Sequence, residues 1–269
     1  VMTDSALLDG ITRIAHEAGK IIHDIYQTDF DVDTKSDGSA VTQADKLAEA
    51  FILQGLGALA PDIPVLAEEA ASEGNIPDLG HEFFLVDPLD GTREFVNRTG
   101  EFTVNIALIR DGRPVMGVVY APGCDKLFSG LLGTGAYLRM VAPDETLSDD
   151  TPAQSITAKQ VDTDNLIAVA SRSHRSPETE DLLRDLGAKD FTPAGSSLKF
   201  CLMAEGKADV YPRLGRTMEW DTGAGQAVLE AAGGVVNVID GKKETGPLMY
   251  NKATRGFDNP HFIAWGKRD

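Results

Sequence analysis

The stretch FFLVDPLDGTREF, residues 83–95, runs four apolar residues directly into two carboxylates three positions apart, Asp87 and Asp90. The apolar run is typical of a buried strand. Asp, Pro and Gly in this order also favour an ordinary tight turn. Two carboxylates at the end of a buried strand, however, repel each other and lose hydration unless a cation lies between them. The turn also leaves the carbonyl of Leu89 free, and hard cations such as magnesium take oxygen ligands of this kind.

Three further acidic positions lie at the ends of predicted elements. Glu68 and Glu69 end the apolar segment IPVLAEE, Asp221 opens a predicted helix, and Asp45 follows Thr42 by three residues. Each position has a local alternative. Acids favour the positive end of a helix, Asp221 suits an N-cap, and Thr42 with Asp45 forms a capping-box pattern. Acidic residues thus lie at the ends of four predicted elements, and at two of these ends a hydrophobic strand comes before them. This coincidence favours one shared metal site.

The net charge limits the classes of partner. The chain has 269 residues and a net charge of −17, from 42 acidic and 25 basic side chains. Such a surface repels nucleic-acid backbones and anionic lipid, so we expect no nucleic-acid polymer as partner. An anionic substrate would need positive charge concentrated locally. Solubility explains the acidity equally well.

Several features favour a cytoplasmic protein. No apolar run approaches the ~20 residues of a membrane-spanning helix, so no integral membrane segment is expected. The first ten residues lack a basic segment followed by an apolar core, so no secretory signal is expected. Cys124 and Cys201 lack metal-type spacing, which favours reduced structural thiols. A loose association with the cytoplasmic face of the inner membrane is left open, as is the choice between monomer and homodimer.

The first half of the chain reads as two helices followed by a sheet. Apolar residues recur at three- and four-residue intervals over 5–27, and a second helix is expected from about Thr42 to Leu59. Segment 31–40 reads as polar and flexible. Alternating segments on both sides of Asp111-Gly112, and a second hairpin in KLFSGLLGTGAYL, predict a largely antiparallel first sheet.

The second half reads as alternating strands and helices. Residues 141–154 lack periodicity, so we place the boundary there: an N-terminal metal-binding α+β domain at 1–154 and a C-terminal α/β substrate-recognition domain at 155–269. Strands are expected at LIAVAS and ADVYP, and two short strands close the chain. Helices are expected from the positions Pro177, Ser196 and Asp221, the last ending at about Ala232.

These segments carry a resemblance to a known family. AEE, DPLDGTREFVNRTGEFTVNIALI and EWDTGAGQAVLEAAGG resemble the three signature segments of the inositol monophosphatase superfamily. NRTGEFTVNIALI, SRSH, GSSLKFCLMAEGKADVYPRLG and MEWDTGAGQAVLEAAGG resemble its bacterial 3′(2′),5′-bisphosphate nucleotidase branch. The resemblance spans almost the whole chain. It implies a layered α-β-α-β-α sandwich with a mainly antiparallel first sheet, a smaller mixed second sheet and an active site between the two halves.

The resemblance also implies roles for individual residues. Glu68 matches a ligand of the first metal, Asp87 bridges two metals, the Leu89 carbonyl completes the first site, and Asp90 and Asp221 hold the second. Glu69 matches a glutamate associated with a looser third metal. The cofactor expected is therefore magnesium, two ions or three. Catalytic roles are implied for Glu68 and for the pair Asp45 and Thr92, which orients the attacking water. Lys35 and Ser36 match a mobile loop near the metals.

Substrate contacts divide into two groups. One phosphate is expected at the metal site, against Glu68, Leu89, Asp90, Gly91, Thr92 and Asp221. The resemblance places the adenosine and its second phosphate against Ser196, Lys199, Arg213 and His174. A helix start with Lys and Arg is a reasonable anion pocket. Ser196 has the alternative of a helix cap, Arg213 that of a surface ion pair, and His174 that of a surface group.

The activity implied is magnesium-dependent hydrolysis of adenosine 3′,5′-bisphosphate to AMP and phosphate, with the sulfated nucleotide as a second candidate substrate. Phosphate monoesters are inert, and two cations roughly 4 Å apart neutralise the entering and leaving oxygens. Two rival interpretations stay open at this point. One is an inositol or sugar-phosphate phosphatase of the same superfamily, and the other is a catalytically silent binding protein.

Overall fold

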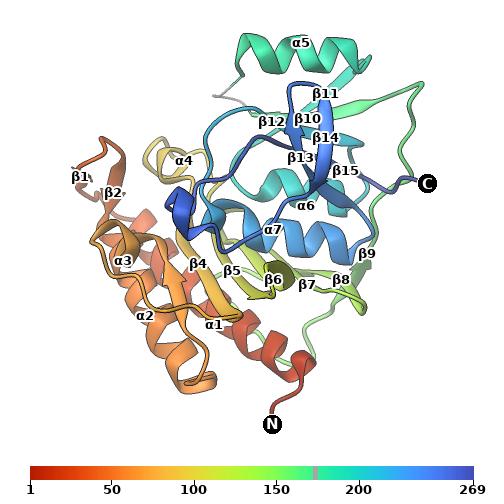
Figure 1. Cartoon of the computed structure of the whole chain (residues 1–269). Helices are drawn as coiled ribbons and strands as arrows, with labels where there is room; N and C mark the ends of the chain where they lie inside the picture. The colour runs from red at the N-terminus through yellow and green to blue at the C-terminus, as the bar shows by residue number, and fades with distance from the viewer. Residues whose placement is uncertain (172–174) are drawn as a thin grey trace.

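Two helices cover the outer face of the first sheet. The computed structural model describes residues 1–171 and 175–269, and its first helix is α1 (Asp4–Tyr26), followed by α2 (Gln43–Leu59). Both lie against the sheet and against each other (Figure 1). The apolar periodicity of the sequence accounts for this placement, because Ile11, Ile22 and Ile52 are fully buried in the shared core. The two predicted helices are confirmed to within a residue or two.

The first sheet has seven strands in the order β3-β4-β5-β6-β7-β8-β9. Only β3 and β4 run parallel, and every other neighbouring pair is antiparallel, as predicted. Its strands are β3 (Val65–Ala67), β4 (Glu82–Asp90), β5 (Thr103–Arg110), β6 (Arg113–Ala121), β7 (Lys126–Leu131), β8 (Gly135–Met140) and β9 (Gln154–Ile156). The β5–β6 hairpin turns at Asp111 and Gly112, whose positive φ values of 50° and 77° match the twist of a two-residue hairpin.

Two helices form the middle layer between the sheets. They are α6 (Leu198–Ala204) and α7 (Glu219–Ala231), and α7 packs along β5, β6 and β7. The approach is close because β6 carries Gly117, where a Cβ atom would lie 2.6 Å from the carbonyl oxygen of Ala224. The helix starts predicted at Ser196 and Asp221 each differ by two residues from the observed starts at Leu198 and Glu219.

The second sheet has six strands in the order β11-β10-β12-β15-β13-β14. It is mixed, because β10 runs parallel to β11 and β12 while the other pairs are antiparallel. Its strands are β10 (Ile167–Ser171), β11 (Asp190–Ala194), β12 (Val210–Arg213), β13 (Val235–Asp240), β14 (Lys243–Pro247) and β15 (Phe262–Trp265). Helix α5 (Pro177–Asp185) covers the outer face through Leu182 and Leu183, which completes the predicted α-β-α-β-α order (Figure 1).

Three details differ from the sequence-based expectation. The segment read as polar and flexible forms a small hairpin of β1 (Val32–Thr34) and β2 (Ala40–Thr42). Strand β11 was not predicted, because its residues are mostly exposed and include a proline. Three strands, rather than two, follow α7. The change from one sheet to the other occurs between β9 and β10, and the domain boundary at 154 stays a prediction.

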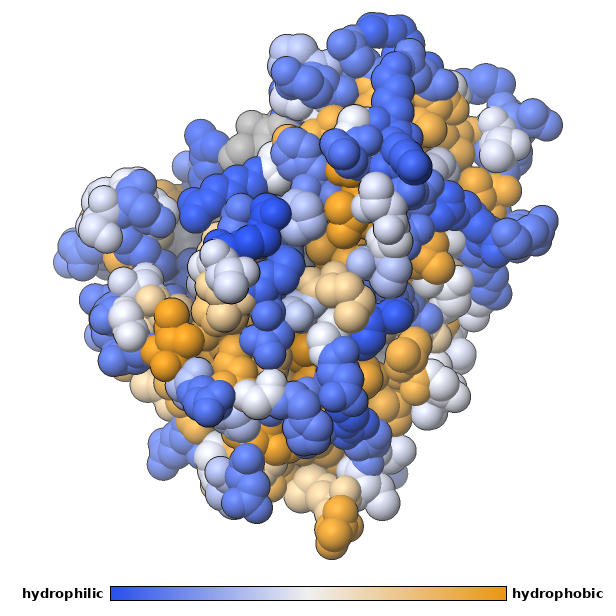
Figure 2. Space-filling model, in the orientation of Figure 1, coloured by the Kyte–Doolittle hydropathy of each residue, from blue (hydrophilic) through white to orange (hydrophobic). Residues whose placement is uncertain are grey.

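Short helices connect several of the larger elements. The short helices are α3 (Glu68–Ser72), α4 (Thr92–Val96), η1 (Pro122–Cys124) and η2 (Ala253–Arg255). Figure 2 shows hydrophilic residues over much of one face, with apolar patches between them. Within the described residues, every helix is too short or too polar to cross a lipid bilayer.

Candidate active site

A β-bulge brings the two carboxylates of the DPLDG segment together. Strands β4 and β5 pair at Asp87–Asn105 and again at Asp90–Thr103, so β4 has one more residue than β5 between these pairs. In a regular strand, residues three apart point to opposite faces. The extra residue of a bulge changes this alternation and bends the strand. The bulge therefore explains how both acids reach one site.

Helix α7 supplies the third carboxylate. Asp87, Asp90 and Asp221 each offer an oxygen, and the three oxygens lie within 4.8 Å of one another. Burial raises the pKa of Asp87 well above its usual value, and the charges of Glu68, Asp90 and Asp221 add to the effect. Burial, followed by the charges of Asp90 and Glu68, raises the pKa of Asp221 to about 8. This all-oxygen set, whose members destabilise one another as anions, fits a hard divalent cation.

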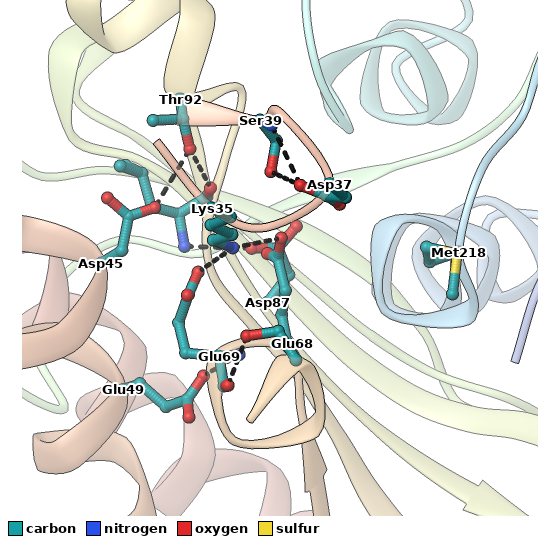
Figure 3. Close-up of polar contacts among 12 residues, drawn as sticks. Lys35, Asp37, Ser39, Asp45, Glu49, Glu68, Glu69, Asp87, Thr92 and Met218 are labelled. Atoms are coloured by element: carbon teal, nitrogen blue, oxygen red, sulfur yellow. Dashed lines mark hydrogen bonds and ion pairs between the residues drawn. The ribbon is translucent and has the colours of Figure 1, made fainter. Parts of the chain in front are cut away.

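Two glutamates and one lysine lie beside the carboxylate cluster. Glu68 and Glu69 begin α3 directly after β3, and Lys35 Nζ lies 3.2 Å from Oε1 of Glu68 and 2.7 Å from Oε1 of Glu69 (Figure 3). Burial raises the pKa of Glu68, and it raises that of Glu69 to about 7. Burial lowers the pKa of Lys35, but the Glu68 and Glu69 carboxylates outweigh it and the net shift is upward. The hairpin of β1 and β2 thus places its own cation in the acidic site.

Asp45 uses its two oxygens for different purposes. Oδ2 accepts the backbone N–H and the hydroxyl of Thr42, both at 2.8 Å, which caps the start of α2. Oδ1 accepts the hydroxyl of Thr92 at 3.0 Å (Figure 3). Asp45 therefore caps α2 and also holds the Thr92 hydroxyl, and its catalytic role stays a prediction. Because the Thr92 proton is donated to Asp45, the Thr92 oxygen keeps its lone pairs for another donor, such as a water.

Leu89 and Gly91 shape the turn that follows the bulge. Leu89 is buried, and its backbone N–H donates to Oδ1 of Asp87 at 3.1 Å, while its carbonyl oxygen lies 3.4 Å from the Thr92 hydroxyl oxygen, whose proton is directed to Asp45. Gly91 has a φ of 85°, in the left-handed region that favours glycine. The turn at Gly91 thus leads from β4 directly into α4, with the Leu89 carbonyl oxygen beside the Thr92 hydroxyl.

The turn before α6 holds Asp90 from the second half of the chain. Oδ2 of Asp90 accepts the Ser196 hydroxyl at 2.6 Å, the Ser197 N–H at 2.9 Å and the Ser197 hydroxyl at 3.0 Å. The Ser196 hydroxyl also lies 2.9 Å from that of Thr103. The structure therefore places Ser196 against a predicted metal ligand. Its role as a nucleotide contact, inferred from resemblance, stays a prediction.

A cavity of about 720 Å³ connects the acidic residues with a basic wall. Lys199 on α6 and Arg213 at the end of β12 are the cationic residues of its lining that we call the basic wall. Lys199 is only 8% exposed, and burial lowers its pKa to about 8. Its ammonium lies 5.6 Å from the centre of the Tyr211 ring. Arg213 donates to the carbonyl of Arg216 at 3.5 Å, and its buried Nε has no partner among the described residues.

Most of the predicted site residues converge on this cavity. Its lining includes Glu68, Asp90, Gly91, Thr92, Ser196, Lys199, Arg213 and Asp221. Asp87 lies in the carboxylate cluster with Asp90 and Asp221, and Asp45 and the Leu89 carbonyl both lie beside the Thr92 hydroxyl. Glu69 is joined to Glu68 through Lys35. His174 lies outside the described residues. Sequence reasoning missed Ser197 and Glu49. Glu49 had a signal, because it follows Asp45 by one helical turn on the buried face of α2.

The chain is similar in sequence and structure to known proteins. Residues 4–261 match the inositol monophosphatase family. The chain is 42% identical over 258 residues to the 3′(2′),5′-bisphosphate nucleotidase CysQ of Shigella flexneri. It is 43% identical over 258 residues to the CysQ of Escherichia coli K12. Each alignment covers 95% of this chain and 98% of the relative. The crystal structure of CysQ from Bacteroides thetaiotaomicron superposes with a TM-score of 0.79 at 39% identity, covering 97% of this chain and 98% of the other.

Proposed function

This chain belongs to the inositol monophosphatase family, and from that premise we propose that it is a phosphatase that hydrolyses adenosine 3′,5′-bisphosphate to AMP and phosphate. Relatives named as 3′(2′),5′-bisphosphate nucleotidases match it over nearly their whole length, which supports this reaction rather than an unrelated phosphatase activity. A silent binding protein is disfavoured because no acidic residue of the predicted ligand set is replaced.

One observation supports a nucleotide with two phosphates as the substrate. The same cavity is lined by the carboxylates of Glu68, Asp90 and Asp221 and by the cationic side chains of Lys199 and Arg213. A phosphate at the carboxylates needs metal ions, whereas a phosphate at Lys199 and Arg213 can be bound by the side chains themselves. A substrate that carries two phosphates suits a cavity with these two kinds of anion site.

We propose magnesium as the cofactor, held by Glu68, Asp87, the Leu89 carbonyl, Asp90 and Asp221, with a looser ion at Glu69. Oxygen ligands of this kind suit magnesium, and the raised pKa values of Asp87 and Asp221 support a site that is completed by cations. Bound magnesium would supply the positive charge that the attacking and leaving oxygens need in phosphoryl transfer.

The chain's own residues orient the reactants. The Thr92 oxygen, whose proton is directed to Asp45, accepts a hydrogen bond from the attacking water. Glu68 lies in the same lining and can receive a proton from that water. A bond forms between the water oxygen and phosphorus, and the phosphorus–ribose oxygen bond breaks. The ribose oxygen takes a proton from solvent and leaves as an alcohol, and Glu68 returns its proton to solvent. Gly91 allows the backbone close to the phosphate.

A side-by-side assay tests this proposal. The purified protein is incubated with magnesium and, in turn, with adenosine 3′,5′-bisphosphate, inositol 1-phosphate and fructose 1,6-bisphosphate, and phosphate release is measured. We expect the highest kcat/KM with the nucleotide. Faster turnover of inositol phosphate would replace our proposal with the inositol phosphatase alternative. Absence of phosphate release from every substrate would favour the silent binding protein. The sulfated nucleotide as substrate, a cytoplasmic location and a monomeric or homodimeric state remain predictions.

A further inference from the structure

Glu49 is a buried carboxylate that the mechanism above does not use. It lies on α2, one turn after Asp45, and is only 4% exposed. Its Oε2 accepts the backbone N–H of Glu69 at 2.7 Å, and its Oε1 accepts that of Ala70 at 2.8 Å. Figure 3 shows Glu49 next to Glu69, on the opposite side from Thr92. Both oxygens are therefore directed at the first turn of α3.

Helix α3 has no N-terminal cap of its own. It is five residues long, and Ala67 at its N-cap position has no side-chain acceptor. The first N–H groups of a helix have no partner within the helix. Its first two residues are Glu68 and Glu69, and the charge of Glu68 repels both Glu69 and the nearby Asp87. A helix this short, with this charge, needs an acceptor from elsewhere in the fold to keep its place.

We propose that Glu49 is a positioning residue for the metal site: it fixes the first turn of α3 so that the Glu68 and Glu69 carboxylates face the cluster of Asp87, Asp90 and Asp221. The inference rests on the metal-dependent function proposed above. Helix α2 then supports the site at two successive turns, because Asp45 orients Thr92 and Glu49 orients the two glutamates. Groups that orient metal ligands typically change metal affinity by about 10- to 100-fold when they are removed.

Asp209 offers a matched control in the other half of the fold. It is fully buried, and its carboxylate also accepts two backbone N–H groups, those of Asp162 at 2.9 Å and Ile167 at 2.8 Å. Its third partner is Lys159. None of these partners belongs to the acidic site. Loss of an acceptor at Asp209 therefore has a structural cost of the same kind as at Glu49, with the Lys159 ion pair weakened in addition, and has no connection to the predicted metal ligands.

The test compares Glu49→Gln with Asp209→Asn and the unmodified chain. Each amide keeps one acceptor and replaces the other with a donor that faces a backbone N–H. Magnesium binding is measured by titration calorimetry without substrate, and thermal stability is measured without metal. We expect both variants to have a lower Tm. We expect only Glu49→Gln to bind magnesium more weakly, by about tenfold or more.

The outcomes separate this inference from the proposed function. If the unmodified chain binds no magnesium, the metal-dependent function itself fails. If it binds magnesium and Glu49→Gln binds it equally well, Glu49 is only structural and the inference is overturned. Equal weakening in Asp209→Asn would also overturn it. If Glu49→Gln does not fold, Glu49→Asp is measured instead. It keeps the charge on a shorter side chain, and we expect weaker magnesium binding there too, whereas an unchanged affinity would overturn the inference.

Discussion

The hydroxyl of Ser196 lies 2.6 Å from Oδ2 of Asp90, although the two residues are 106 positions apart and belong to different halves of the chain. Ser196 has a φ of 56°, in the left-handed region that is unusual for residues other than glycine. The same turn leads into α6, which carries Lys199 into the cavity. One turn therefore links Asp90, a predicted metal ligand, to Lys199 in the cavity lining.

The strained backbone of Ser196 predicts an unusual order of stability. Ser196→Gly and Ser196→Ala both lose the bond to Asp90, but only glycine adopts a positive φ without cost. We expect the alanine variant to be less stable than the glycine variant by about 1 kcal/mol. Denaturant unfolding of both variants checks this, and an alanine variant equal to or more stable than glycine would contradict it.

Asp90→Asn should abolish turnover while the fold is retained. Ser196 and Ser197 donate to Oδ2, so the asparagine oxygen must face them and its NH₂ group must face the cluster. A donor in that position cannot bind a cation. Removing one negative charge should also raise the Tm of the metal-free protein at pH 8. Phosphate release and thermal unfolding with and without magnesium measure both effects, and substantial activity at saturating magnesium would remove Asp90 from the ligand set.

The metal-free protein should lose stability as the pH rises from 5 to 8. The pKa of Asp221 is raised to about 8 and that of Glu69 to about 7 in the folded state, so between these pH values the folded chain binds more protons than the unfolded chain. Stability therefore falls as these groups lose protons. Thermal unfolding of the metal-free protein, measured between pH 5 and pH 8, checks this. The range ends at pH 8 because the pKa of Lys199 is lowered to about 8, so above this pH Lys199 makes stability rise with pH.

Magnesium should reduce this pH dependence. Cations favour the ionised carboxylates, so they remove the cost of deprotonation in the folded state. Thermal unfolding in a chelator and in excess magnesium, across the same pH range, gives the two slopes. Equal slopes would show that the acidic cluster does not bind the ion.

Thr92→Val should lower kcat by about 100-fold or more while magnesium affinity is unchanged. Valine keeps the shape of threonine but has neither a proton for Asp45 nor an oxygen for water. Thr92→Ser restores the hydroxyl and serves as the control, with activity within about tenfold of the unmodified chain. Steady-state kinetics and magnesium calorimetry separate the two parameters. Equal activity in the serine and valine variants would exclude the orienting role.

Lys199→Ala and Arg213→Ala should raise KM for adenosine 3′,5′-bisphosphate more than for adenosine 3′-monophosphate, because only the bisphosphate carries a second anion for them. Arg216→Ala is the matched control, since Arg216 lines the same cavity but its side chain is 73% exposed. Exposed charges contribute little to binding. An equal increase in KM for both nucleotides would remove Lys199 and Arg213 from the second phosphate site.

Local sequence patterns predicted most of the helices and strands because they depend on near neighbours. Apolar periodicity located α1 and α2, and Asp111-Gly112 located the hairpin of β5 and β6. Strand β11 was not predicted from the sequence because it lacks an apolar face. Periodicity reports burial, and an exposed edge strand has little of it.

The sequence named the residues of the candidate site but not the contacts between them. For Asp45 the sequence offered a cap or a site role, and the structure shows that each carboxylate oxygen has one of these partners. A capping box depends on residues three apart, so it can be seen in the sequence. The bond from Thr92 joins segments 47 positions apart and cannot be seen there.

The sequence by itself determined the inventory: the acidic residues at element ends, the turn at Gly91 and the family resemblance. The tertiary structure decided which oxygen of Asp90 faces the serines, how the β4 bulge turns Asp87 and Asp90 to one site, and which helix Glu49 caps. The physical reason is that short-range preferences depend on the backbone and adjacent side chains, whereas the direction of a buried carboxylate depends on donors brought from distant segments by strand register and packing.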